Sequence, residues 1–200
     1  MRVIVIGATG TIGRAAADAL AARHEVVRVG HSGGEFRADL ESAASLEALF
    51  REVAPFDAVV CCAGNATFKP LAELTEEGFN LGLRSKLMGQ VNVVRLGLAH
   101  VADGGSFTLT SGVLAHEPMP GGAAISPVNA AVEAFAKAAA LELPRGVRVN
   151  VVSPPWVSET LEMMGMDPSG GVPAQKLAAA YVRCVEGTAN GETVDGRTFA

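Results

Sequence analysis

Gly7-Ala8-Thr9-Gly10-Thr11-Ile12-Gly13 decides the fold of this chain, because it lies between an apolar run at residues 3–6 and a helical pattern that begins at Arg14. A strand, a glycine-rich turn and a helix in this order direct backbone N–H groups and the helix N-terminus at a phosphate. The first glycine permits a sharp turn, the second leaves room for a pyrophosphate, and the third lets the helix pack on the strand. The spacing G-x-x-G-x-x-G differs from the G-x-G-x-x-G of the standard dinucleotide motif. We predict a nucleotide-binding turn here, and the alternative is a tight turn without a ligand.

Strand-like and helix-like stretches alternate through the rest of the chain. Short apolar runs predict strands at residues 2–6, 25–29, 36–38, 58–62, 106–111, 148–152 and 193–198. Amphipathic patterns predict helices at residues 12–22, 43–53, 76–101, 127–143 and 173–186, the fourth with Ser126 as its N-cap and Pro127 in its first turn. This alternation predicts an α/β fold in one domain, residues 1–200: a doubly wound, Rossmann-type parallel sheet of about seven strands with helices on both faces. Residues 154–172 are predicted to form either a short lid or a long connection.

The composition is that of a globular protein, with 49% apolar and 18% charged residues and a net charge of −5. The 16 basic residues form no run, which argues against nucleic acid or an anionic membrane as a partner, and no apolar run has the length of a membrane span. The three cysteines and the four histidines lack the spacing of metal ligands. We expect residues 2–6 to be a strand rather than part of a signal peptide. The expected protein is cytoplasmic, holds no metal and acts on a small molecule.

The second predicted strand ends without a carboxylate. An acidic residue at this tip would bind the ribose hydroxyls of NAD and repel a 2′-phosphate. The tip carries Gly30, His31 and Ser32 instead. With Arg14 after the glycine-rich turn, the site offers several donors to an anion, which predicts NADP as the cofactor. NAD is the alternative if Glu35 reaches the ribose, and an ordinary serine–glycine turn also explains the residues at the tip.

Several further stretches resemble the short-chain dehydrogenase/reductase family along nearly the whole chain. They are Asp39-Leu40, Cys62-Ala63-Gly64, Gly105-Ser106-Phe107-Thr108-Leu109-Thr110-Ser111, and Arg148-Val149-Asn150-Val151-Val152-Ser153-Pro154 after an alanine-rich helix. The resemblance implies an NAD(P)-dependent oxidoreductase acting on a carbonyl or an alcohol. With the donors at the strand tip, the predicted cofactor-binding residues are Gly7, Thr9, Gly10, Thr11, Ile12, Gly13, Arg14, Gly30, His31, Ser32, Asp39, Leu40, Ala63, Gly64, Asn65 and Pro154. The family dimerises through the helix at residues 130–143 and the one before it, which implies a homodimer or a homotetramer built from it.

The chain departs from the family at four active-site positions. Ile125 stands at the position of the family's tyrosine, Asn129 at that of its lysine, Gly112 at that of its serine and Lys86 at that of its asparagine. In the family, the phenol protonates the alkoxide that hydride transfer leaves, and the ammonium lowers the pKa of the phenol. Isoleucine does neither. The single tyrosine, Tyr181, is predicted to lie far away in the last helix.

The asparagine and lysine positions are exchanged rather than lost. We hypothesise that Lys86 supplies the positive charge beside the nicotinamide ribose, with Asn129 opposite it, and that Ser111 or Thr110 supplies a hydroxyl donor. A buried lysine with a depressed pKa is itself a proton donor. The alternative is that Lys86 is a solvated helix residue and that the exchange is a coincidence.

His116 is a second candidate acid on the loop after the fifth predicted strand, because histidine side chains as a class titrate near neutral pH. Glu117 is placed to orient it, and the alternative is an exposed histidine without a role. Two functions therefore fit the sequence: an NADP-dependent oxidoreductase with a rearranged active site, or a non-catalytic NADP(H)-binding sensor or partner subunit.

Overall fold

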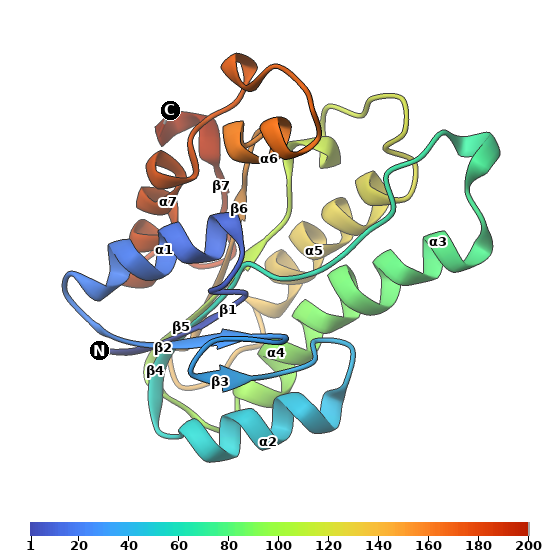
Figure 1. The fold of residues 1–200 in the computed structure, drawn as a ribbon. Coiled ribbons are helices and arrows are strands. Elements are labelled where there is room, and N and C mark those ends of the chain that lie inside the picture. Colours follow the sequence, from blue (N-terminus) through green and yellow to red (C-terminus); the bar gives the residue numbers. More distant parts are fainter. Residues whose placement is uncertain (200) are drawn as a thin grey trace.

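The computed structural model describes residues 1–199 as a parallel seven-stranded sheet flanked by helices (Figure 1). The strand order is β3-β2-β1-β4-β5-β6-β7, which confirms the predicted doubly wound α/β fold. The strands are β1 (Arg2–Ile6), β2 (Glu25–Gly30), β3 (Phe36–Arg37), β4 (Phe56–Cys61), β5 (Val101–Thr110), β6 (Arg148–Ser153) and β7 (Thr193–Asp195). The order reverses beside β1, so the carboxyl ends of β1 and β4 flank the crevice where such sheets bind ligands.

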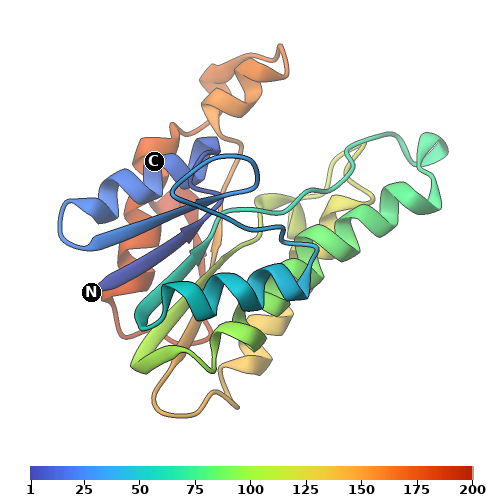
Figure 2. The same cartoon turned by 60° about the horizontal axis from the view of Figure 1, so that its bottom comes forward.

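Helices cover both faces of the sheet (Figures 1 and 2). On one face α1 (Thr11–Ala21) packs against α7 (Ala174–Glu186). The other face carries α2 (Ala43–Val53), α4 (Gly89–Gly97) and α5 (Ile125–Ala139). The remaining helices, α3 (Glu76–Leu81) and α6 (Ser158–Met163), are short.

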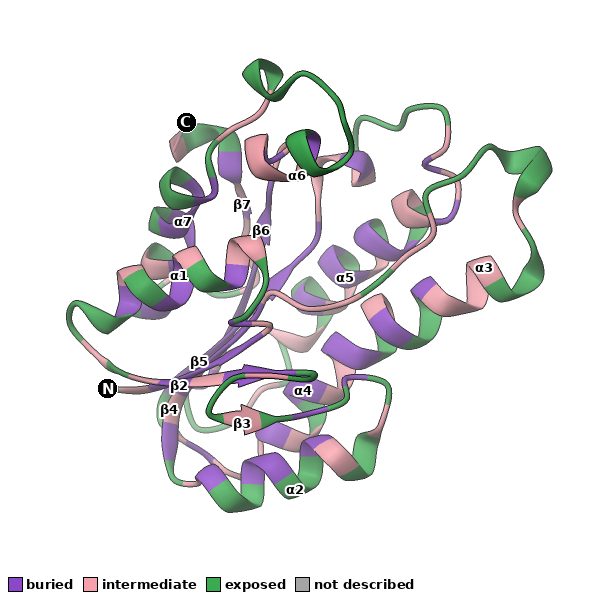
Figure 3. Ribbon diagram, viewed as in Figure 1, coloured by how far each residue is buried: buried purple, intermediate pink, exposed green. Residues whose placement is uncertain are grey.

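Alternation along β1 builds the two cores. Ile4 and Ile6 belong to the apolar cluster beneath α2, α4 and α5, whereas Val3 and Val5 belong to the cluster beneath α1 and α7. All four side chains are buried, as are most residues of the central strands (Figure 3). A strand covered on both faces needs apolar residues at every position, which explains the unbroken run at residues 3–6.

The predicted helix at residues 76–101 differs most from the structure. It consists of α3, a π-helical segment η2 (Gly82–Met88) and α4, and it ends at Gly97. Val101 already belongs to β5, where it pairs with Phe56 of β4. A π-helix holds more residues per turn than an α-helix, and such segments are frequent at functional sites.

The prediction that Ser126 caps the helix after β5 is wrong. That helix, α5, begins at Ile125, because the N–H groups of Ile125 and Ser126 both donate to the carbonyl of Gly122. The preceding Gly121 has φ +88°, a conformation that favours glycine, and it shapes the turn that supplies this carbonyl. Two elements end several residues earlier than predicted: α5 stops at Ala139, and β7 stops at Asp195 before a 3-10 turn (Gly196–Phe199).

Residues 154–172 fold as α6 and a 3-10 turn (Pro168–Gly170), which lie beyond the carboxyl ends of the strands (Figure 1). An isolated bridge between Val157 and Val172 joins the two ends of this segment. Leu161 is buried in it, whereas Met163 and Met164 are exposed. That this segment acts as a lid stays a prediction.

Candidate active site

The glycine-rich turn leaves no room for side chains at its ends. Gly7 has φ +86°, and a Cβ atom there would lie 3.0 Å from the backbone of Cys62 and Ala63, so the turns after β1 and β4 touch. A Cβ atom at Gly13 would lie 2.0 Å from the carbonyl oxygen of Gly7. The helix α1 starts after Gly10 with no side chain capping it. Its first N–H groups therefore have no intrahelical acceptor and are available to an anion.

A cavity of about 350 Å³, which we call the glycine-loop cavity, lies in front of this turn. It is lined by Ile6, Gly7, Thr9, Gly10, Gly30, His31, Ala38, Asp39, Leu40, Glu41, Cys62, Ala63, Gly64, Asn65 and Ser85. Ten of these residues are among those predicted to bind the cofactor. One oxygen of the Asp39 carboxylate already accepts a hydrogen bond, from the Glu41 N–H at 2.9 Å.

The other predicted cofactor-binding residues lie around this cavity. Arg14 donates to the carbonyl of Thr9 at 3.1 Å and lines, with Thr11, an adjoining cavity of about 900 Å³. Ser32 is exposed in the turn after β2. Ile12 and Pro154 line a third cavity on the far side of Gly64.

This third cavity, the lysine cavity, has a volume of about 310 Å³ and brings Lys86, Ser111 and Asn129 together. Its other lining residues are Ile12, Cys62, Gly64, Thr110, Gly112, Val113, Leu114, Ile125, Pro154, Pro155, Trp156, Val157 and Thr160. Cys62 and Gly64 also line the glycine-loop cavity, so the two cavities adjoin along the carboxyl edge of the sheet.

Lys86 enters this cavity from the π-helical segment. A Cβ atom at Gly64 would lie 2.9 Å from both the Cα and the Cδ of Lys86, so the side chain lies directly against the turn after β4. Burial lowers the pKa of Lys86, an effect that the neighbouring Cys61 and Cys62 thiols partly oppose. No carboxylate of residues 1–199 lies within 4.0 Å of its ammonium group. Lys86 is half-buried, and a cation that is partly removed from water without a counter-charge is disfavoured. Such groups concentrate at functional sites.

Asn129 occupies the other side of the lysine cavity on α5. It is 2% exposed, and its Oδ1 makes no hydrogen bond within residues 1–199. A Cβ atom at Gly112 would lie 2.9 Å from the Nδ2 of Asn129, so a serine at position 112 would displace this amide. Gly112 and Asn129 are therefore matched to each other in space, a relation that their positions in the sequence do not show.

Thr110 is not available as a donor to a substrate. Its hydroxyl donates to the carbonyl of Cys61 at 2.7 Å and lies 3.0 Å from the hydroxyl of Tyr181. The prediction that Tyr181 lies far away is therefore wrong, because α7 packs behind the ends of β4 and β5. Burial raises the pKa of Tyr181 well above its ordinary value, which leaves the phenol a neutral structural group.

Gln90 on α4 was missed by sequence reasoning. Its side chain accepts the N–H of Thr110 and donates to the carbonyl of Thr110, both at 2.8 Å. It also donates to the carbonyl of Lys86 at 3.2 Å. Gln90 thereby fixes the end of β5 against the segment that carries Lys86.

Ser111 and His116 meet through Glu133, which sequence reasoning also missed. The hydroxyl of Ser111 donates to Oε1 of Glu133 at 2.7 Å, and Nε2 of His116 lies 2.6 Å from Oε2. Glu117 is not the partner of His116, as its carboxylate accepts a hydrogen bond from Arg197 at 2.6 Å. The available signal was the four-residue spacing from Asn129 to Glu133, which places both on one face of α5.

Comparison with protein families identifies the family of this chain. A family model described as enoyl-(acyl carrier protein) reductase matches residues 3–183. The chain belongs to the short-chain dehydrogenase/reductase family. It is 30% identical over 154 residues to hydroxynaphthalene reductase arp2 of Aspergillus fumigatus, covering 74% of this chain and 56% of that protein. It is also 28% identical to an uncharacterized oxidoreductase of Methylorubrum extorquens, covering 86% and 81%. This family member therefore spans only about half the length of the fungal reductase it matches.

Solved structures resemble this chain along nearly its whole length. Protein lin1944 from Listeria innocua is 40% identical, with a TM-score of 0.94 and 98% of each chain covered. A small-chain dehydrogenase in complex with NADPH is 25% identical, with a TM-score of 0.86, covering 100% of this chain and 98% of that one.

Among residues 1–199, no helix combines the length and the apolar character that crossing a membrane requires. No group of three or more His, Cys, Asp or Glu side chains there is arranged to hold a metal ion.

Proposed function

We propose that this protein is an NADP(H)-dependent oxidoreductase that interconverts a small carbonyl compound and its alcohol. The observation that carries the proposal is the lysine cavity. It holds Lys86 and Asn129 in exchanged positions and adjoins the glycine-loop cavity. One ammonium and one amide thus remain beside the expected place of the nicotinamide, although each comes from the other helix.

The residues present fit a dinucleotide. The close approach of Gly13 to Gly7 and the uncapped start of α1 suit a pyrophosphate. His31 in the lining of the glycine-loop cavity and Arg14 in the adjoining cavity favour the 2′-phosphate of NADP(H), since β2 carries no carboxylate at its tip. The related dehydrogenase with NADPH supports the same cofactor. Asp39 and Glu41 line the same cavity, which keeps NAD(H) as the competing cofactor to be measured.

The cofactor, when bound, supplies a hydride to the carbonyl carbon. The protein must then stabilise the negative charge on the carbonyl oxygen and deliver a proton to it. Lys86 provides the positive charge. Ser111 provides the hydroxyl. Its acceptor is the Glu133 carboxylate, which can take up a proton and then donate to Ser111. The hydroxyl of Thr110 instead donates to a backbone carbonyl, and Ile125 has no hydroxyl.

A non-catalytic NADP(H) sensor is the second candidate. It is favoured by Ile125 and Gly112, which leave the lysine cavity without the usual phenol and serine. In that case Lys86 contributes only to cofactor binding.

Titration with NADPH and NADH, followed by a turnover screen, separates these functions. We expect NADPH to quench or enhance fluorescence at lower concentrations than NADH. We also expect NADPH oxidation with at least one member of a panel of aromatic aldehydes, cyclic ketones and bicyclic aromatic ketones. The last class is included because hydroxynaphthalenes tautomerise to such ketones. Tight NADPH binding without turnover across the panel would establish the sensor, and absence of binding would refute both functions.

We also propose that the protein is a homodimer. Leu141, just beyond α5, is 89% exposed, and α5 is rich in small residues that permit close helix packing. Light scattering is expected to give a mass of about twice the 20.5 kDa of one chain. A monomer mass at all concentrations would contradict this proposal.

A further inference from the structure

The geometry points to a proton relay in which buried Glu133 passes protons between Ser111 in the lysine cavity and the solvent-facing His116. This inference rests on the proposed function, because it assigns the source of the proton that carbonyl reduction consumes. It identifies Glu133 and His116 as residues that act through Ser111 rather than on the substrate itself.

The three side chains form an uninterrupted chain from the interior to the surface. The Ser111 hydroxyl and the His116 Nε2 atom contact opposite oxygens of Glu133, at 2.7 and 2.6 Å. The Glu133 side chain is 4% exposed, whereas that of His116 is 62% exposed. Contacts this short to a buried carboxylate are charge-assisted hydrogen bonds, the connections along which protons move.

Glu133 also separates two cavities. Ser111 lines the lysine cavity. His116 and Glu133 line a different cavity of about 250 Å³, and Val113 is common to both. A proton that follows this chain enters through a cavity that shares no lining residue with the glycine-loop cavity, so a cofactor bound in the glycine-loop cavity would leave this entry open.

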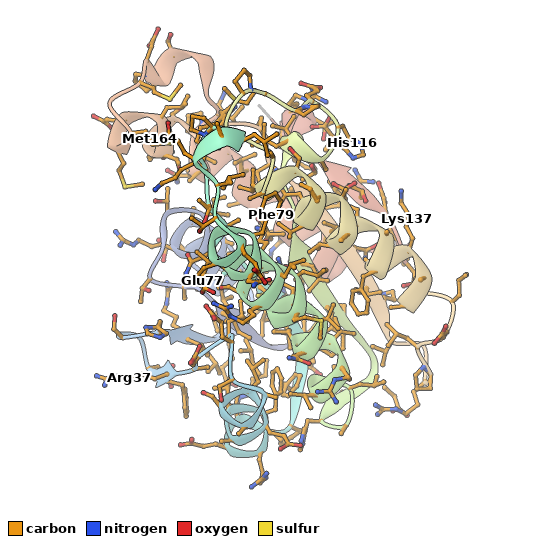
Figure 4. The ribbon with its side chains drawn as sticks, turned by 90° about the vertical axis from the view of Figure 1, so that its right-hand side faces the viewer. Arg37, Glu77, Phe79, His116, Lys137 and Met164 are labelled. Carbon is orange, nitrogen blue, oxygen red and sulfur yellow. The ribbon has the colours of Figure 1, made fainter. Side chains whose placement is uncertain are left out.

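The other charged groups around the relay either form ion pairs with one another or line the small cavity without contacting Glu133. Asp195 of β7 and Glu117 both bind Arg197, at 2.7 and 2.6 Å. Arg197 and the neighbouring His116 both lower the pKa of Asp195. Lys137, one turn beyond Glu133 on α5, lines the same small cavity and lies on the same side of the molecule as His116 (Figure 4). Of these groups, His116 alone contacts the Glu133 carboxylate among the residues described.

The proton balance closes without another reactant. During reduction the hydride goes to the carbonyl carbon, and the resulting alkoxide oxygen takes the hydroxyl proton of Ser111. Before this step, protonated His116 has donated its Nε2 proton to Oε2 of Glu133, and a half-turn of the carboxyl group has brought that proton beside Ser111. The neutral Glu133 carboxyl then re-protonates Ser111 and returns to the carboxylate, and water returns a proton to His116. Alcohol oxidation runs the same steps in reverse.

Glu133→Gln and His116→Ala test the relay on the carbonyl that the wild type reduces. The glutamine has the shape of Glu133 but cannot pass a proton, so we expect kcat for reduction to fall about 10²-fold with an unchanged Kd for NADPH. We expect a similar fall for His116→Ala, and added imidazole should restore its turnover because position 116 faces solvent.

Glu142→Gln and His100→Ala are the matched controls. Glu142 is exposed, and His100 directly precedes β5, so it lies at the amino end of that strand whereas the lysine cavity lies at the carboxyl end. Both should keep wild-type turnover. Wild-type kcat in His116→Ala, or failure of imidazole to restore it, would overturn the relay while leaving the reductase intact. If Glu133→Gln does not fold, the imidazole response of His116→Ala decides alone. If the wild type itself reduces no carbonyl, the proposed function fails and the relay with it.

Discussion

Lys86→Met should lower kcat for carbonyl reduction by about 10³-fold and weaken NADPH binding to a smaller extent. Methionine keeps the length of the side chain in the lysine cavity. It removes the ammonium group, which is the charge that Lys86 places beside the reacting oxygen. A donor placed where negative charge develops accounts for losses of this size in other enzymes. Steady-state kinetics and a fluorescence titration measure the two effects. Unchanged turnover and unchanged NADPH affinity would contradict the assigned role.

The same substitution should stabilise the folded protein. Burial lowers the pKa of Lys86 in the folded state, so between that pKa and the ordinary lysine value of about 10.4 the unfolded chain binds more protons. Wild-type stability therefore rises with pH across this interval, and the penalty is fully present below it. Lys86→Met lacks the penalty, so its Tm should exceed that of the wild type at neutral pH, and the difference should shrink as the pH approaches about 10.4.

Lys176→Met is the control for both measurements. Lys176 is exposed on α7, so its substitution should change neither kcat nor the Tm by a measurable amount. A Tm for Lys86→Met below that of the wild type at neutral pH would show that the ammonium group is stabilised by the fold. Such a result would contradict the inference that the fold tolerates an unfavourable ammonium group because Lys86 has a functional role.

Gly13→Ala should be the most damaging small substitution in the chain. The added Cβ would lie 2.0 Å from the carbonyl oxygen and 2.6 Å from the carbonyl carbon of Gly7, and both are backbone atoms of a constrained turn. We expect a loss of about 3 kcal/mol of unfolding free energy, because overpacking against backbone forces α1 away from β1. For a chain of this size that corresponds to a fall in Tm of about 10 °C. NADPH binding should also be lost, since the displaced turn no longer directs its N–H groups at the pyrophosphate.

Gly170→Ala is the matched control for this experiment. A Cβ atom at Gly170 would meet nothing within 4 Å. Its Tm and NADPH affinity should equal those of the wild type within error. A folded Gly13→Ala variant that binds NADPH normally would contradict the close packing of the turn.

Local patterns predicted the architecture well, because each strand and helix carries its own periodicity. All seven strands occur, and β1 and α2 have the predicted ends. The errors lie where an interaction from outside the segment decides the boundary. The carbonyl of Gly122 starts α5 ahead of Ser126, and pairing with Phe56 turns Val101 from helix into strand. The π-helical form of Gly82–Met88 has no signature in the letters of that segment.

The sequence by itself determined the family, the glycine-rich turn and the exchange of Lys86 with Asn129, since these depend on residue type and spacing along the chain. The tertiary structure alone decided which donors are free. The Thr110 hydroxyl donates to the Cys61 carbonyl, and the hydroxyl of the buried Tyr181 lies beside it. Glu133 joins Ser111 to His116, which are 22 and 17 residues away from it along the chain. Hydrogen bonds form between groups that are close in space. The packing of α5 against β5 brings these groups together. Spacing in the sequence does not specify the distance between them.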